Sequence, residues 1–300
     1  MNAETIHKTV LLNESIDGLR LKVGEVFLDA TINGGGHSAE VARRFAGSVK
    51  IIGIDLDGDA LERAGKRLEA GGADFMLKRA NFRDIRTVVG EIGSAPDKIL
   101  FDLGWSSDQM ESGRGFSFQK DEPLRMTYSK ESDGEAVTAR EILNSWDEEN
   151  IADIIYGFGE ERYAKRIAKA IAEERQRNPI NTTFEFVEII YRAIPAAYRG
   201  GKIHFATKTF QALRMAVNDE LPALKEALSG AFEVLRPEGR LAVISFHSSE
   251  DRVVKRFFKE LSSDRKHVLV NKKPITPSVQ EVKSNRRARS AKLRIIEKHL

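Results

Sequence analysis

The sequence predicts an α/β fold, in which a doubly wound, mostly parallel sheet is interrupted by an inserted all-helical domain. Short apolar, β-branched runs alternate with segments whose apolar residues recur at three- and four-residue steps, which is typical of alternating strands and helices. A cluster of glycines follows the first apolar run directly. A long polar loop without clear periodicity follows Asp102, and from about 137 to 192 the pattern is helical. We therefore expect a discontinuous sheet domain, residues 1–108 and 206–300, and an inserted helical domain, residues 109–205.

The first predicted strand, residues 26–28, is closed by Asp29 and leads into a glycine turn at 34–36. A helix is expected to begin after Ser38. A strand, a glycine turn and a helix open a nucleotide-binding half-sheet, because a glycine has no Cβ to keep the backbone away from a ligand. Residues 34–39 also fit the loose form G-x-G-x-x-A of the dinucleotide fingerprint, although an ordinary glycine-rich turn explains them equally well.

The second predicted strand, residues 50–54, ends at Asp55, 19 residues after Gly36. This spacing suits a carboxylate at the strand tip that accepts hydrogen bonds from the two hydroxyls of a ribose. The alternative role for Asp55 is a cap for the helix that follows it. Asp57 or Asp59 could serve as that cap, which favours the ribose role for Asp55.

The remaining elements continue the alternation to residue 104 and resume it after residue 206. The first half adds helices near 7–18, at 61–70 and up to about 93, with strands at 74–77 and 97–104. The second half adds helical periodicity at 204–235, a strand at 236–248 and a helix around 253–258. Short strands at 268–270 and 294–297 are expected to form an antiparallel edge pair, and the basic stretch 271–290 is expected to be loop or partly disordered.

Ligands of such sheets bind outside the carboxyl ends of the strands. Four segments are expected to converge there: the glycine turn, Asp55, Phe82 and the loop after Asp102. Phe82 follows the third strand and is either a core residue or an apolar wall beside an adenine ring. Asp102 ends the fourth strand and precedes Leu103 and Gly104 rather than a helix, which weakens the alternative that it is a helix or turn cap.

Composition excludes several classes of protein. The chain has 300 residues, of which 41% are hydrophobic and 31% charged, so it can bury a sizeable core. It has no cysteine, which excludes disulfides, thiolate metal sites and a thiol nucleophile and favours a reducing cytoplasm. No signal-like or membrane-spanning apolar run is present. Residues 252–300 carry 15 Lys/Arg against 4 Asp/Glu, which indicates either a docking end for a polyanion or a solvated charged surface.

A series of sequence blocks, spread in order over nearly the whole chain, resembles the ribosomal RNA small subunit methyltransferase H family. The blocks are HKTVLL (7–12), DATINGGGHS (29–38), GIDLD (53–57), DLGWSS (102–107), RGFSF (114–118), YGFGEERYAKRIAKAI (156–171), ATKTFQALRMAVNDEL (206–221), SFHSSEDR (245–252) and RARSAKLR (287–294). Taken together, these blocks are far more specific than the glycine motif alone.

The resemblance implies a class I methyltransferase fold, with S-adenosylmethionine as cofactor and the inserted helical domain recognising the substrate. It implies methylation of the exocyclic N4 of a cytidine in the decoding (P-site) region of 16S rRNA, either free or within the 30S subunit, and it is compatible with a homodimer. Matched by position, the implied cofactor contacts are Gly35, Gly36, His37, Asp55, Phe82, Asp102 and Gln109. For His37, a local hydrogen bond at the start of a helix is an open alternative.

The implied reaction depends mainly on positioning the target amine next to the methyl group, rather than on activating the methyl donor. The N4 lone pair is delocalised into the cytosine ring, and an acceptor for its N–H would raise the electron density on nitrogen. The sulfonium is already a good leaving group, so no metal is required. Positioning supplies on the order of 7–11 kcal/mol at best. The residues expected to act on the target are Asp102, as an acceptor or by positioning the cofactor, Trp105, by stacking, and Ser245 and His247, by contact with the flipped cytidine.

Basic residues are expected to contact the RNA backbone, offsetting the few kcal/mol that flipping a base costs. They are His204, Lys208, Arg214, Arg252, Arg287, Arg289 and Lys292. For Lys208 in particular, a solvated cationic face is the alternative.

The chain departs from the family pattern in a few places. Arg125 and Thr127 stand where the family usually has an acid and an arginine, and Asp108 precedes Gln109. Phe205 stands where proline is usual, and Ser249 where leucine is. These changes put the loop around 123–128 in doubt, but they barely touch the expected cofactor contacts.

Three other functions remain to be weighed. An NAD-linked dehydrogenase could share the opening motif, but the SFHSSEDR segment and the basic tail have no evident role in hydride transfer. A catalytically silent, RNA-binding ribosome assembly factor is disfavoured by the intact Gly35, Asp55 and Asp102. A hydrolase with a Ser/His pair is disfavoured because no G-x-S-x-G nucleophile elbow is present.

Overall fold

The computed structural model describes residues 8–104, 112–128, 137–201, 203–263 and 266–299. The chain divides into two compact units: residues 1–106 with 221–300, called here the sheet unit, and residues 107–220, called the helical unit. The second junction therefore lies at 220/221 and not at the expected 205/206. The reason is that α11 (Thr207–Val217) packs on α6 (Ala139–Ser145) and α7 (Glu148–Gly157) of the helical unit.

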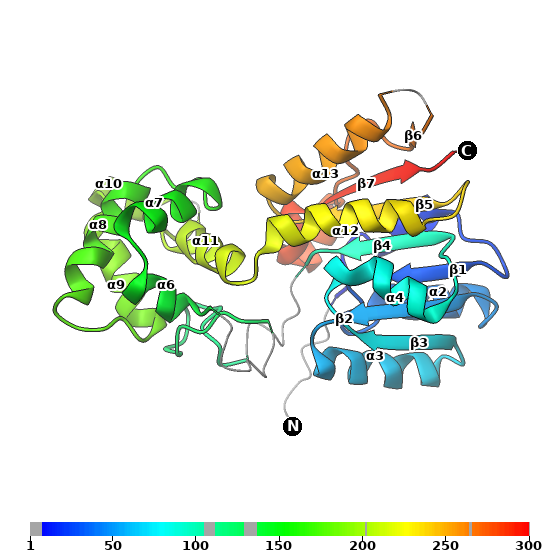
Figure 1. Cartoon of the computed structure of the whole chain (residues 1–300), viewed down its shortest axis with the longest axis horizontal. Coiled ribbons are helices and arrows are strands. Elements are labelled where there is room, and N and C mark those ends of the chain that lie inside the picture. The colour runs from blue at the N-terminus through cyan, green and yellow to red at the C-terminus, as the bar shows by residue number, and fades with distance from the viewer. Residues whose placement is uncertain (1–7, 105–111, 129–136, 202, 264–265, 300) are drawn as a thin grey trace. The chain divides into compact units, whose positions relative to one another are not determined.

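The sheet unit contains, within the described residues, a seven-stranded sheet in the order β3-β2-β1-β4-β5-β7-β6 (Figure 1). Its strands are β1 (Val26–Asp29), β2 (Lys50–Asp55), β3 (Asp74–Arg79), β4 (Lys98–Asp102), β5 (Arg240–Ser245), β6 (Val268–Leu269) and β7 (Lys292–Glu297). The first five of these strands run parallel, while β7 is antiparallel to both β5 and β6. This arrangement confirms the predicted doubly wound, mostly parallel sheet.

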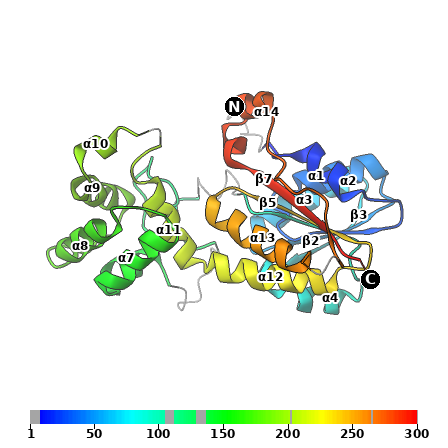
Figure 2. The ribbon, with the colours of Figure 1, turned by 90° about the horizontal axis from the view of Figure 1, so that it is seen from above.

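Side chains alternate between the two faces of the sheet and divide the core into two layers. On one face, strand residues such as Leu28, Ile54 and Phe101 pack with α4 (Ile85–Ile92), α12 (Glu220–Val234) and α13 (Ser248–Leu261). On the other face, residues such as Phe27 and Leu100 pack with α1 (Leu12–Leu19), α2 (Gly36–Phe45) and α3 (Gly58–Ala70). Figure 2 shows helices on both sides of the strands. Because both faces are covered, the central strands are apolar along most of their length.

The helices of the sheet unit, with one 3-10 turn after β3, follow the predicted alternation. They are α1 (Leu12–Leu19), α2 (Gly36–Phe45), α3 (Gly58–Ala70), the turn η1 (Phe82–Asp84), α4 (Ile85–Ile92), α12 (Glu220–Val234) and α13 (Ser248–Leu261). Two begin earlier than expected: α2 begins at Gly36 and α3 at Gly58, where Asp57 is the N-cap and accepts from the Asp59 N–H. Asp57 thus has the capping role that left Asp55 available.

The C-terminal stretch is more ordered than the sequence predicted. The expected pairing of β6 with β7 is confirmed, but β7 pairs along its full length with β5 and is not an edge strand. The stretch 271–290 is not simply loop or disordered, because it forms α14 (Val279–Ser284) and the 3-10 turn η2 (Arg286–Ser290). The Glu281 carboxylate on α14 accepts from the Leu11 N–H at 2.8 Å. This contact, between residues far apart in the sequence, is invisible to local patterns.

The helical unit is built around α8 (Ala164–Arg175), which packs on α6, α7 and α9 (Thr183–Ala193). The short helix α10 (Ala196–Arg199) follows α9. Thr182 caps α9 in a reciprocal capping box with Glu185, as one of the two expected cap residues. The main chain of Leu124 donates to the Asn181 carbonyl at 3.0 Å, which ties the unusual 123–128 loop to the start of α9.

None of the helices among the described residues is long and apolar enough to cross a lipid bilayer.

An ion-pair cluster joins α13 to β7, and we expect the loss of its carboxylate, Asp251, to destabilise the protein strongly. The Asp251 carboxylate accepts from Arg294 Nε at 2.7 Å and from Lys292 Nζ at 3.1 Å, and Asp251 and Arg294 are 9% and 8% exposed. We expect Asp251→Asn to lower the free energy of unfolding by about 3 kcal/mol at neutral pH, because Arg294 loses its counter-charge. Urea unfolding measures the change.

The same variant has an expected pH dependence. Burial raises the pKa of Asp251, but Arg294 and Lys292 outweigh it and hold this pKa below the usual 3.8. The stabilisation is therefore present above the unfolded-state pKa and is lost as the pH falls through the folded-state pKa, below about pH 4. Glu62→Gln, which breaks the exposed Glu62–Lys66 pair, is the control and should change stability by less than about 0.5 kcal/mol. Equal losses from both variants would contradict this account.

Candidate functional site

Three neighbouring parallel strands end in aspartate at the same edge of the sheet. Asp29 ends β1, Asp55 ends β2 and Asp102 ends β4, and β1 lies between the other two. The chain leaves β1 toward β2 and β3 on one side, and β4 and β5 lie on the other side. This is the topological switch point at which ligands of doubly wound sheets bind.

Asp55 joins two loops through its carboxylate. Its Oδ2 accepts from the Asn33 N–H at 2.9 Å, and its Oδ1 accepts from the Asp57 N–H at 2.9 Å. Burial raises the pKa of Asp55 to about 6, against the lowering effect of these two backbone hydrogen bonds. Each oxygen keeps a second lone pair, so the carboxylate can still accept from the hydroxyls of a sugar.

The three glycines of the turn have different surroundings. Gly35 has a φ of +73°, and a Cβ there would lie 3.1 Å from the Ala64 Cα. A Cβ on Gly36 would lie 2.0 Å from the Thr9 Oγ1. A Cβ on Gly34 would meet nothing within 4 Å. Gly35 and Gly36 are therefore required by the packing of the protein itself, and Gly34 is the one that borders open space.

Asp102 is 7% exposed and lies close to His37 at the start of α2. The Asp102 Oδ2 is 3.6 Å from the His37 Nδ1, and the Asp102 Oδ1 accepts from the Gly104 N–H at 3.2 Å. Burial, together with the nearby Asp29 and Glu250, raises the pKa of Asp102 to about 7 against the lowering effect of the Gly104 hydrogen bond. A carboxyl with this pKa can exchange a proton near neutral pH.

Asp29 was not assigned a role from the sequence. It is 2% exposed, its Oδ2 accepts from the Ser38 Oγ at 2.7 Å, and its Oδ1 is buried without a hydrogen-bond partner among the described residues. Burial raises the pKa of Asp29 to about 7. The repeated aspartate at the ends of three strands was a signal that could have identified it. A buried carboxylate with an unused oxygen suits a cationic ligand, which fits the sulfonium and ammonium groups of S-adenosylmethionine.

Phe82 contributes to the core, and its expected contact with an adenine ring stays a prediction. It begins the turn η1 just after β3, is partly buried against the sheet core, and meets the Phe101 ring edge-on at 6.0 Å. Part of its surface therefore remains available at the end of β2 and β3.

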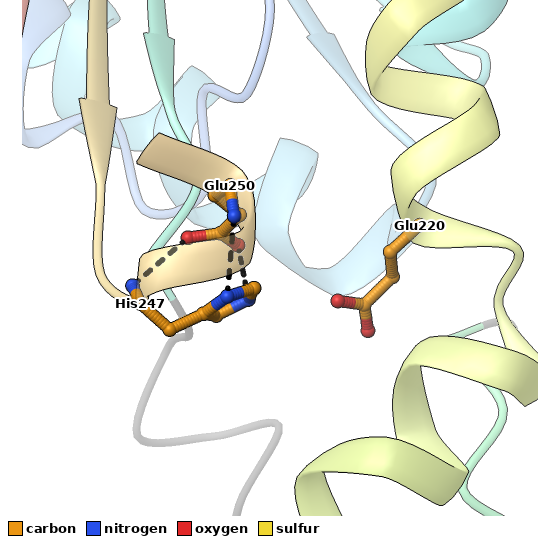
Figure 3. A group of neighbouring side chains, drawn as sticks. All are labelled: Glu220, His247 and Glu250. Atoms are coloured by element: carbon orange, nitrogen blue, oxygen red, sulfur yellow. Dashed lines mark hydrogen bonds and ion pairs between the residues drawn. The ribbon is translucent and has the colours of Figure 1, made fainter. Parts of the chain in front are cut away.

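Ser245 and His247 follow the end of β5, and both already have structural contacts. Ser245 is 2% exposed, and its Oγ donates to the Lys292 carbonyl at 3.5 Å. His247 is the N-cap of α13: its Nδ1 accepts from the Glu250 N–H, while the Glu250 carboxylate accepts from the His247 N–H, both at 3.3 Å (Figure 3). Their expected contact with the target cytidine stays a prediction.

Two expected site residues, Trp105 and Gln109, lie outside the described residues. Their roles in stacking and in cofactor binding stay predictions.

Four of the basic residues expected to contact RNA lie in the sheet unit, and they differ in exposure. Arg252 on α13 and both Arg287 and Arg289 on η2 are exposed. Lys292 instead lies at the start of β7 and is paired with Asp251. The RNA contacts expected of these four residues stay predictions.

The helical unit holds the other three expected contacts. Arg214 is 9% exposed and makes a two-point ion pair with Glu220 at 2.6 and 2.7 Å. The Lys208 Nζ donates to the Glu160 carbonyl at 2.9 Å. The His204 ring stacks between Phe118 and Phe205. Arg214 therefore has a structural role that its position in the sequence did not reveal.

The MraW methylase family matches residues 4–299 of the chain. A ribosomal RNA small subunit methyltransferase H from Brevibacillus brevis is 44% identical over 309 residues, covering 97% of this chain and 98% of the relative. The protein of that name from Heliobacterium modesticaldum is 46% identical over 310 residues, with 97% and 98% covered. A solved rRNA methylase from Streptococcus thermophilus has 13% identity and a TM-score of 0.47, covering 98% of this chain and 99% of that one. The sequence similarity thus extends over nearly the whole chain.

The glycine turn predicts a matched pair of variants. Gly35→Ala should lower the free energy of unfolding by at least about 1 kcal/mol, because alanine is strained at a positive φ and its Cβ meets the Ala64 backbone. Gly34→Ala should leave stability unchanged but weaken the binding of S-adenosylmethionine, since its Cβ enters the open space. Thermal unfolding and calorimetric titration measure the two effects. Unchanged cofactor affinity in Gly34→Ala would show that no ligand approaches the turn there.

Replacing the buried Asp102 carboxyl at the end of β4 by a neutral side chain should stabilise the folded protein, and the gain should depend on pH. Because the folded-state pKa of Asp102 is raised to about 7, its contribution is fully present below the unfolded-state pKa and is lost as the pH rises through 7. Asp102→Asn should therefore stabilise the cofactor-free protein at about pH 8, by up to about 4 kcal/mol, and have little effect near pH 4. The exposed Glu69→Gln is the control. A destabilised variant at the higher pH would refute the buried, proton-retaining carboxyl.

Proposed function

Because the chain belongs to the MraW methylase family, we propose that it methylates the exocyclic N4 of a cytidine in the decoding region of 16S rRNA. S-adenosylmethionine supplies the methyl group as an electrophilic sulfonium substituent. The observation that carries the proposal is the set of three aspartates at the ends of β1, β2 and β4, around a glycine turn with open space at Gly34. This edge offers hydrogen-bond acceptors for a ribose and buried carboxylates for a cation.

We assign a separate task to each side chain of this edge. Asp55 accepts from the ribose hydroxyls, while its two backbone hydrogen bonds fix the carboxylate in place. Asp29 faces the cationic end of the cofactor with its unused Oδ1. Phe82 borders the adenine with the part of its ring that the Phe101 contact leaves uncovered. These tasks need no movement of the strands that hold the residues.

Asp102 is the residue we assign to the target amine. As a carboxylate it accepts from the N4–H, which raises the electron density on the nitrogen. Its pKa of about 7 lets it take up the proton that the amine loses after methylation. Trp105 is expected to stack on the base.

The finer identity of the partner is also part of the proposal. The relatives are named for small-subunit ribosomal RNA, and we take 16S rRNA, free or within the 30S subunit, as the substrate of this chain. Methylation would then take place in the cytoplasm, where these subunits assemble. The helical unit is the segment we assign to substrate recognition, and a homodimer stays a prediction.

Tritiated S-adenosylmethionine tests the function directly. The purified protein should transfer label to unmethylated 30S subunits or 16S rRNA, and nucleoside analysis should find N4-methylated cytidine. Asp102→Asn should lower kcat by roughly 100-fold or more, and Trp105→Ala should raise KM roughly 5- to 100-fold, the range of a lost base stack. Glu69→Gln, an exposed carboxylate on α3, is the control. If both Asp102→Asn and Trp105→Ala produced labelled cytidine at the wild-type rate, the roles assigned to these two residues would be refuted.

A further inference from the structure

We propose that one face of the helical unit is a stacking platform for single-stranded RNA, made of a row of aromatic rings bordered by arginines. The ring row consists of Phe118, Tyr191, His204 and Phe205. The proposal rests on the function proposed above, and it names the surface that would hold nucleotides next to the target.

The ring row is a continuous stack. The rings of Phe118 and His204 are 4.4 Å apart and within 12° of parallel, and those of His204 and Phe205 are 4.2 Å apart. Phe205 and Tyr191 are 5.7 Å apart and tilted. Phe118 also meets the buried Phe210 edge-on at 5.5 Å. One end of the row is thus anchored in the core, while Tyr191 at the other end is 41% exposed.

His204 is held in the row as a neutral ring. Its Nδ1 accepts from the Ala206 N–H at 3.3 Å, so the proton of the neutral imidazole sits on Nε2. Burial lowers the pKa of His204 below its usual 6.5, which keeps the ring uncharged at neutral pH. The exposed residue therefore presents an N–H donor within an aromatic stack.

An arginine extends the row beyond its exposed end. The Arg199 guanidinium lies 3.8 Å from the centroid of the Tyr191 ring. Its Nη2 donates to the Ile194 carbonyl at 3.3 Å, and its Nε is buried without a hydrogen-bond partner within the described part of the chain. Most of the five N–H donors of this guanidinium are thus left for other acceptors.

A second ring pair with arginines adjoins the row through α10. Tyr198, next to Arg199, meets the Tyr163 ring at 4.9 Å. The Arg162 guanidinium lies 4.6 Å from the Tyr198 ring and 4.8 Å from the Tyr163 ring. As far as the structure describes the chain, neither Arg162 nor Arg199 has a carboxylate partner. These cations are therefore paired with rings rather than with acids.

Rings and unpaired arginines in one surface fit a single-stranded nucleic acid. Between Tyr191 and Asn218 the chain has no Asp/Glu. The guanidinium groups of Arg162 and Arg199 are the cations of this surface that would attract a polyanion. Flat rings bind the faces of bases, which are exposed in single strands and hidden in a duplex. An acidic protein surface would match the charge but not the rings. RNA next to a flipped target offers both phosphates and free base faces.

Binding of a fluorescein-labelled oligouridylate tests the platform without requiring methyl transfer. Phe205→Leu and Tyr191→Leu keep apolar volume but remove one ring, and each should raise the Kd roughly 5- to 100-fold, the range of one base–aromatic stack. Binding to a blunt RNA duplex should change little. Arg199→Ala should reduce the slope of log Kd against log salt by about 1.

Two variants on the same unit serve as controls. Phe184→Leu removes a ring that is 49% exposed but outside the row, and Arg192→Ala removes a cation already paired with Glu188. Neither should alter oligouridylate binding, and all variants should keep the wild-type affinity for S-adenosylmethionine. If Phe205→Leu lowers the Tm, the result for the exposed Tyr191→Leu decides.

The outcomes separate this platform from the methyl-transfer function. Weakened oligouridylate binding in the ring variants supports the platform even if no RNA accepts a methyl group, which would instead overturn the proposed function. A wild-type Kd in both ring variants overturns the platform even if methyl transfer is found. Weakened binding to 30S subunits alone, with oligouridylate binding intact, also overturns it, because the surface would then contact a ribosomal protein.

Discussion

The carboxylate of Asp55 is the constraint on which the cofactor edge depends. It accepts one backbone N–H from the turn after β1 and one from the turn after β2, so a single side chain fixes the spacing of two loops. Asn33, one of the donors, has a φ of +50°, an uncommon conformation for a residue other than glycine. The glycine turn can therefore hold its shape before any ligand arrives. Preorganisation of this kind reduces the ordering that binding would otherwise require.

The same edge of the sheet also holds two buried acidic side chains close together, which is electrostatically unfavourable. Asp29 and Asp102 are almost fully buried at the ends of adjacent strands, and this burial raises the pKa of each carboxyl. Nothing in the fold requires acids there, since neutral side chains would be easier to bury. A cationic ligand would relieve the repulsion between them. The site is thus less stable when empty than a neutral one would be, as expected where function and stability compete.

Much of the fold could be predicted because local sequence patterns determine its strands and helices. The apolar runs before Asp29, Asp55 and Asp102 gave the strands, and their order followed from the α/β alternation. What local patterns could not show were contacts between distant residues. The packing of Thr9 on Gly36 and the ordering of α14 by Leu11 both depend on the folded chain. The aspartate that ends three strands was a local signal that could have identified Asp29, and the RNA contact expected of Arg214 stays a prediction beside its ion pair with Glu220.

The position of β7 has a consequence for how the protein is made. Its residues, 292–297, lie between β5 and β6 in the sheet and are synthesised after both of these strands. The contiguous helical unit, residues 107–220, can be finished earlier, while the sheet unit must wait with the edge of β5 unpaired. A translation product cut short before this strand would expose that edge, which is a template for aggregation. Closure of the sheet therefore depends on residues 292–297, which are made long after the strands β1 to β5 that they complete.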